Sequence, residues 1–116
     1  METRAVTVEV PDELARRLER MKPWLSTVLE LGLAGFRTQA VETASEIVEF
    51  LAGGPSAVEV FEYHASDRSQ RRLRRLFALQ AAGQLSPEEQ TEQDELERIE
   101  HILIMLKARL QREHVH

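Results

Sequence analysis

The stretch that decides the fold reads VTVEV at residues 6–10, followed at once by PDEL at residues 11–14. The first five residues alternate apolar and polar side chains, which is typical of a β-strand with one buried face. Pro11 then precedes Asp12 and Glu13, an order of residues that begins many α-helices. We therefore expect a short strand over about residues 4–10 that leads directly into a helix over about residues 11–21.

The remainder of the chain carries the patterns of helices. Proline in KPW at residues 22–24 interrupts the first helix, and Ser26 or Thr27 can cap a second one, within which Gly32 would mark a close approach between helices. The pair Thr43 and Glu46 fits a capping box, or the second helix continues through it. Apolar stripes predict further helices over about residues 44–52, 56–64, 66–82 and 87–112, with Phe77 facing inward. The expected fold is mainly α, with a short N-terminal strand, two helices and a helical C-terminal extension ending in a long helix.

Length and charge restrict the possible classes of protein. The 116 residues accommodate one domain with an extension, which we divide into residues 1–40 and 41–116. A net charge of −5 argues against a general nucleic-acid binder driven by phosphate neutralisation. The chain has no cysteine, no long apolar run and no charged-then-apolar leader. We therefore expect no disulfide, no membrane span, no signal peptide and a cytoplasmic location.

Charge is unevenly distributed in the second region. Residues 66–82 are rich in arginine and residues 84–100 are rich in carboxylates. The arginines are Arg68, Arg71, Arg72, Arg74 and Arg75. No aromatic side chain interleaves with them for base stacking, so we expect a solvated face or pairing with the acidic start of the last helix.

The sequence shows no visible catalytic machinery. Its histidines do not form a His-x-x-x-His pattern, and there is no nucleophile elbow and no glycine-rich phosphate loop. We therefore predict a protein that is not an enzyme and has no catalytic residue, no metal site and no cofactor.

The alternation at the N-terminus assigns a different task to each face of the expected strand. One face would hold a homodimer through Val6, Val8 and Val10. The strands of two protomers would form a ribbon that enters the major groove of DNA. The DNA-binding residues would be Arg4, Ala5, Thr7 and Glu9, with Ser26 and Thr27 at a helix start offering N–H groups to phosphate. Glu9 fits this role poorly, because phosphates repel a carboxylate.

The long last helix carries a second candidate contact. Its apolar side chains recur at spacings of three and four, which is typical of a seam between packed helices. These partner-binding residues are Leu96, Ile99, Leu103, Leu106 and Leu110.

Residues 4–37, and above all VTVEVPDELARRL at 6–18, resemble the opening of ribbon-helix-helix proteins, a family with many antitoxins of bacterial toxin–antitoxin pairs. The resemblance implies a dimeric antitoxin or small transcriptional regulator that binds operator DNA through paired strands and a toxin through its C-terminal helices. The C-terminal part, with LSPEE at 85–89 and LKAR at 106–109, is similar to small bacterial proteins, and this similarity implies an HNH-type nuclease as one candidate toxin. The alternative is a helical adaptor that binds only protein and uses the strand for dimerisation.

Overall fold

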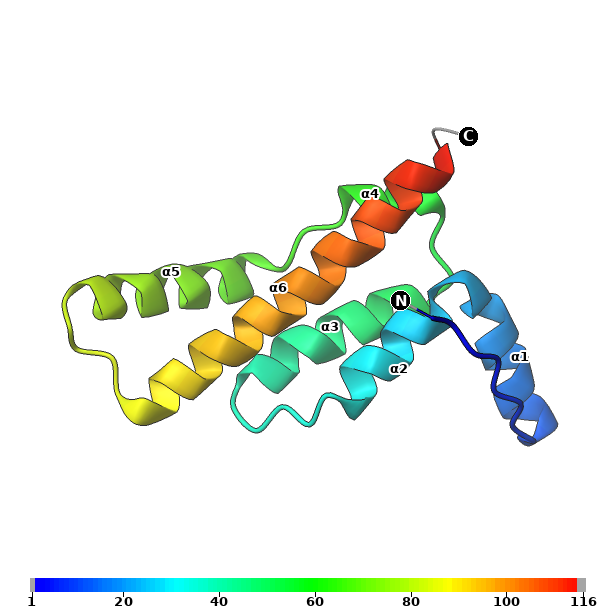
Figure 1. Ribbon diagram of the computed structural model, residues 1–116, viewed down its shortest axis with the longest axis horizontal. Helices are drawn as coiled ribbons and strands as arrows, with labels where there is room; N and C mark the ends of the chain where they lie inside the picture. Colours follow the sequence, from blue (N-terminus) through cyan, green and yellow to red (C-terminus); the bar gives the residue numbers. More distant parts are fainter. Residues whose placement is uncertain (1, 115–116) are drawn as a thin grey trace.

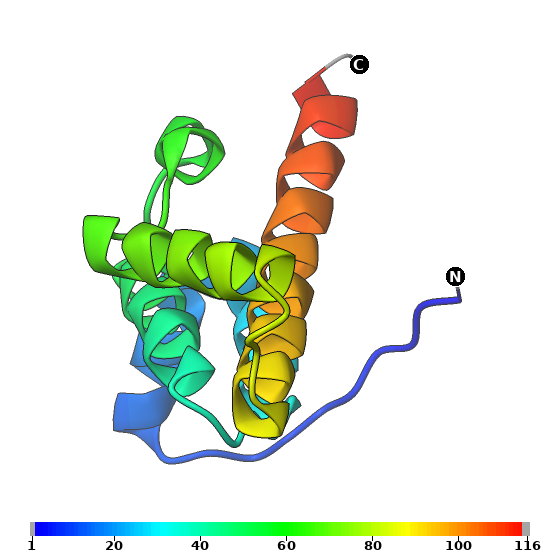
Figure 2. The ribbon, with the colours of Figure 1, turned by 90° about the vertical axis from the view of Figure 1, so that its left-hand side faces the viewer.

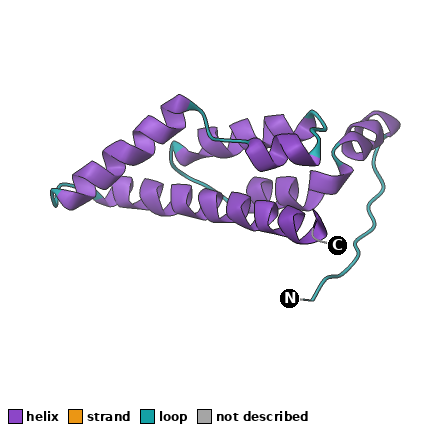
Figure 3. Ribbon diagram, turned by 90° about the horizontal axis from the view of Figure 1, so that it is seen from above, coloured by secondary structure: helices purple, strands orange, loops and turns teal. Residues whose placement is uncertain are grey.

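The computed structural model describes residues 2–114, and within that range all regular structure is helical (Figure 3). The elements are α1 (Asp12–Arg20), the 3₁₀ turn η1 (Lys22–Trp24), α2 (Leu25–Leu33), α3 (Ala40–Ala52), α4 (Ala57–Glu62), α5 (Asp67–Ala81) and α6 (Pro87–His114) (Figure 1). Among these residues, no helix has the length and apolarity that a membrane crossing requires.

Helix α6 is the central helix, against which α2, α3, α4 and α5 all pack. Its 28 residues correspond to a length of about 42 Å, and α2 and α3 pack beside it while α4 packs near its C-terminal half (Figure 1). Helix α5 crosses in front of α3 and α6 (Figure 2). The side chains of one continuous core come from every element except α1: Trp24, Leu31, Ala40, Ala44, Ile47, Leu51, Val60, Leu76, Leu96, Ile99, Ile102, Leu106 and Leu110. Trp24 and Leu31, from the first predicted region, therefore share a core with the second.

The expected N-terminal strand is wrong for the single chain. Residues 2–10 run as an extended segment that leads away from the helices (Figure 2), and no backbone hydrogen bond joins them to the other described residues. A strand exists only where a second strand satisfies its N–H and C=O groups, and the described chain supplies no such partner. Alternation of apolar and polar residues contains no information about whether a second strand lies beside the segment.

Three smaller expectations are also wrong. Gly32 has no atom within 4 Å of the place where a Cβ would stand, so it marks no close approach. Helix α3 begins at Ala40, which puts Thr43 inside the helix instead of at its cap. Phe77 is 45% exposed, because α5 touches the core along a stripe centred on Leu76.

Local start signals predicted the last two helices well. Ser66 accepts a hydrogen bond from the Ser69 N–H at 3.2 Å and caps α5, at the start of the range expected for this helix. Ser86 and Glu89 satisfy each other's backbone N–H groups at 3.1 and 3.0 Å ahead of α6. The hydrogen bond from the Ser86 backbone N–H is the main cause that holds the pKa of the Glu89 carboxyl below its ordinary value.

Candidate functional site

The N-terminal arm, defined here as residues 2–10, is exposed over nearly its whole length. Val6 is 82% exposed and Val8 is 73% exposed, whereas Val10 is half-buried where the arm meets α1. The four expected DNA-binding residues of the arm, Arg4, Ala5, Thr7 and Glu9, are all exposed. An alternating apolar segment of this kind is a surface that the described residues 11–114 leave without a partner.

Helix α1 continues this open surface. Although its apolar and charged side chains lie on separate faces, none of its side chains is buried by the described residues. Leu14 is 38% exposed and Leu18 is half-buried. The helix meets the core mainly at its end, where Arg20 lies against Gly54 in the loop after α3. The arm and α1 thus form one region that is anchored at its C-terminal end and open elsewhere.

The two expected helix-start residues, Ser26 and Thr27, differ in exposure to solvent. Ser26 is exposed near the start of α2, but Thr27 is only 6% exposed and faces the core. The first amide of α2, at Leu25, donates to the Lys22 carbonyl because η1 runs directly into the helix. A helix start whose N–H groups are already used by the chain offers fewer of them to a phosphate.

The seam of α6 lies inside the chain. Leu96, Ile99, Leu106 and Leu110 are each at most 6% exposed, and Leu103 is half-buried against the same core. These side chains pack on α2, α3, α4 and α5, so an outside partner reaches them only where one of those helices moves away.

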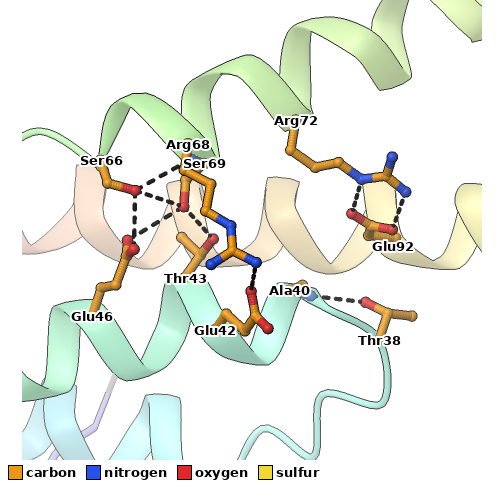
Figure 4. A network of polar contacts seen from close by, with 10 residues as sticks. All are labelled: Thr38, Ala40, Glu42, Thr43, Glu46, Ser66, Arg68, Ser69, Arg72 and Glu92. Carbon is orange, nitrogen blue, oxygen red and sulfur yellow. Dashed lines mark hydrogen bonds and ion pairs between the residues drawn. The ribbon is translucent and has the colours of Figure 1, made fainter.

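Helix α5 is held over α3 and α6 largely by polar contacts (Figure 4). Arg72 donates from Nε and one Nη to the two oxygens of Glu92, at 2.6 and 2.8 Å. The Glu92 side chain is only 6% exposed, so its carboxylate has lost most of its water. The two hydrogen bonds from the Arg72 guanidinium take the place of that water. The bonds to Glu92 outweigh burial and raise the pKa of Arg72. This pair confirms the expected contact between the arginine-rich segment and the acidic start of α6.

A second group of polar contacts joins the start of α5 to α3. Ser66 and Ser69 donate to the two oxygens of Glu46 at 2.9 and 3.3 Å, and Thr43 bonds the Ser69 hydroxyl at 2.8 Å (Figure 4). Arg68 adds an exposed ion pair with Glu42 of α3 at 3.0 Å. Sequence reasoning missed this group, because the serines and the carboxylate are separated by about one helix and a loop. The only local signal was Glu46 on the same turn as Thr43.

Unfilled space lies along two sides of α5. A cavity of about 280 Å³ borders Ser69, Gln70 and Leu73, and its floor is formed by Ile47 and Ile99. A second cavity, of about 270 Å³, borders the arginine side of the same helix, including Arg68, Arg71, Arg72 and Arg75. Leu76, between these two sides, is the single α5 side chain that the described chain buries completely.

The loop between α2 and α3 is fastened to α6 by Glu95. Its carboxylate accepts the N–H groups of Arg37 and Thr38 at 2.9 and 3.0 Å, and the Thr38 hydroxyl at 2.6 Å. Burial opposes the charged form, but these three hydrogen bonds outweigh it and lower the pKa of Glu95.

Comparisons of the chain with models of protein families, with characterised proteins and with solved structures returned no match. The ribbon-helix-helix resemblance therefore stays an expectation carried by the N-terminal residues alone.

Proposed function

We propose that the protein is a dimeric regulator of the antitoxin type, in which the N-terminal arms of two copies pair with each other. The observation that carries this proposal is the arm itself, with Val6 and Val8 exposed by 82% and 73% and no partner in the described chain. Extended segments with unpaired backbone groups and an apolar face pair readily with a copy of themselves. The assignment to the antitoxin type rests on the resemblance of residues 4–37 to ribbon-helix-helix proteins.

The energetics require more than the arms. Burying Val6 and Val8 in both copies contributes on the order of 6–12 kcal/mol, which is comparable with the cost of bringing two chains together. The apolar face of α1, with Leu14 and Leu18, is the adjacent surface that no described residue buries. We therefore assign the dimer contact to the arm and α1 together.

In this proposal the dimer presents Arg4 and Thr7 to operator DNA. Both are exposed, and they occur in a region whose charges balance, whereas the chain as a whole carries −5. The protein partner is a toxin that binds the C-terminal helices, with an HNH-type nuclease as one candidate. A cytoplasmic location goes with this function, and the absence of cysteine supports it.

Light scattering at a series of concentrations tests the dimer. Val6→Asp/Val8→Asp places charges on two exposed positions, so the single chain keeps its helix content and the mass falls to that of a monomer. Val58→Asp is the matched control, because Val58 is 59% exposed on α4, outside the arm. An unchanged mass in the arm variant contradicts the dimer contact.

The DNA half has its own test, an electrophoretic shift of the DNA upstream of the protein's own gene. We expect a shift at low salt, where phosphate contacts are strongest, and its loss in Thr7→Ala. A dimer that fails to shift this DNA at low salt would instead favour the helical adaptor.

A further inference from the structure

Helix α5 is fastened to the molecule differently from the other helices of the core. Among the described residues it buries Leu76 alone, whereas the slightly shorter α3 buries five side chains. Leu73 packs against the core as a partly buried side chain. The other contacts of α5 with α3 and α6 are polar: the Arg72–Glu92 pair, the hydroxyl contacts of Ser66 and Ser69 with Glu46 and Thr43, the exposed Arg68–Glu42 pair, and a hydrogen bond from Gln93 to Gln80. When α5 leaves as a whole, both partners of each polar contact return to water, Glu92 included, so these contacts are given up at less net cost than buried apolar area.

The surface beneath α5 is apolar and incompletely filled. We call it the α3–α6 groove, with a floor of Ile47, Leu96, Ile99 and Leu103. The first cavity, of about 280 Å³, lies between this floor and α5, whereas the second, of about 270 Å³, borders the arginine side of α5 and shares only Leu96 with the floor. Both cavities open to solvent along the edges of α5, so along these edges the helix makes fewer contacts than a closely packed helix does.

The groove also defines the chemistry of its occupant. Carboxylates line it on both sides, with Glu46 and Glu42 on α3 and Glu92 on α6. The helix now seated there meets them with hydroxyls at its start and with arginines at positions four apart, Arg68 and Arg72. An amphipathic helix with leucines on one stripe and arginines beside it therefore fits the groove in both charge and polarity.

We propose that α5 is a displaceable cover, and that the α3–α6 groove binds an amphipathic, arginine-bearing helix of a partner protein in its place. Displacement returns Leu96, Ile99 and Leu103 to the surface, so the seam of α6 then contacts the partner. This inference extends the partner-binding half of the proposed function and rests on it. It requires neither the arm, nor the dimer, nor DNA.

The test uses a synthetic, fluorescein-labelled peptide with the sequence of residues 64–84 as the probe, and the full-length chain as its receptor. The chain's own α5 competes at a high effective concentration, so the receptor carries Arg72→Glu, which places two carboxylates against each other at Glu92. The control peptide carries the same charge reversal. We expect the wild-type peptide to bind at least tenfold more tightly than the control, as measured by fluorescence anisotropy.

A disulfide lock makes the test specific for the groove. The Thr43 and Ser69 hydroxyl oxygens lie 2.8 Å apart and the chain has no cysteine, so Thr43→Cys/Ser69→Cys can form one defined bond between α3 and α5. Oxidation of the receptor with these two cysteines added weakens peptide binding at least tenfold, and reduction restores it. Equal binding by locked and reduced receptor, or by the two peptides, overturns the proposal.

A second measurement covers the case in which Arg72→Glu does not fold. In hydrogen exchange of the unaltered chain, the most protected amides of α5 exchange at least tenfold faster than those of α3. In the lock variant, oxidation removes this difference. Equal protection of the two helices in the unaltered chain means that α5 opens only with the whole molecule, which also overturns the proposal. None of these outcomes bears on the mass of the arm variant, so the dimer is judged separately.

Discussion

At the scale of single residues, Gly54 fixes where α1 joins the core. Its φ of +71° lies in the left-handed region, and a Cβ there would stand 2.8 Å from Arg20 Cγ and 2.9 Å from the Arg20 carbonyl oxygen. The end of α1 therefore approaches the loop after α3 more closely than any side chain at this position would permit.

Gly54→Ala should lower the free energy of unfolding by more than the roughly 1–2 kcal/mol that the left-handed conformation alone costs a residue with a Cβ. Gly83→Ala is the matched control, because Gly83 has a similar φ of +68° and open space at its Cβ position. Urea unfolding followed by circular dichroism measures both variants. Equal losses of unfolding free energy in the two variants would show that α1 moves away from the new Cβ at Arg20 without an energetic cost.

Glu95 makes stability depend on acid. Its pKa is lower in the folded chain than its ordinary value of 4.5, so its contribution is complete above that pH and disappears as the pH falls through the folded pKa. Unfolding free energies measured from pH 7 to pH 3 should fall on the acid side, and Glu95→Gln should flatten that fall. In the variant we expect a loss of about 1–3 kcal/mol at pH 7, because charge-assisted hydrogen bonds to Thr38 and Arg37 are weakened. If the unfolding free energy of Glu95→Gln falls as steeply with acid as that of the unaltered chain, the acid dependence comes from other carboxylates, such as Glu89.

At the scale of elements, the ion pair between α5 and α6 differs from the one between α5 and α3. Glu92 is buried and Arg72 is 31% exposed, whereas Arg68 and Glu42 are 76% and 55% exposed. Solvent replaces the second pair readily and the first one poorly.

Arg72→Ala should therefore cost about 2 kcal/mol of unfolding free energy, because it leaves the Glu92 carboxylate buried without its donor. Arg72→Ala/Glu92→Ala should cost clearly less than the sum of the two single changes, since the isolated buried charge is then gone. Arg68→Ala is the control and should change stability by less than about 0.5 kcal/mol. Strict additivity at Arg72 and Glu92 would mean that the pair contributes nothing.

The elements differ in how far the sequence predicts them. Helices α5 and α6 were predicted nearly to the residue, because Ser66 and Ser86 are caps whose partners lie within three residues. The arm was assigned to a strand, and this was wrong for the single chain because strand pairing is decided by a neighbour that the local pattern does not contain.

The candidate surfaces show the same contrast between features that nearby residues decide and features that a distant element decides. The period-two pattern of the arm predicted one buried face, but both faces are exposed over residues 2–9. The seam of α6 gave no sign that its partners are helices of the same chain. The contact of Glu46 with Ser66 and Ser69 was not predicted, because it depends on how α5 crosses α3. Periodicity predicts which face of a helix is apolar, but not which element covers it.

At the scale of the whole molecule, the chain is more extended than its length requires. Its radius of gyration is 16.1 Å, whereas a compact chain of this length has about 13 Å. The excess corresponds to the arm and α1 at one end and the α5–α6 hairpin at the other (Figures 1 and 3). The parts of the molecule that are least packed in the single chain are thus the parts to which we assign its contacts.

The position of Trp24, the one tryptophan, bears on how this molecule can be followed in solution. Its indole is 4% exposed, donates to the Pro55 carbonyl at 3.0 Å and shares a cavity with Leu110 near the end of α6. Intrinsic emission therefore reports on the end of the core remote from the Arg72–Glu92 contact. If α5 detaches first, an emission transition will lag behind the loss of helical ellipticity, and non-coincident curves will mark the chain as other than two-state.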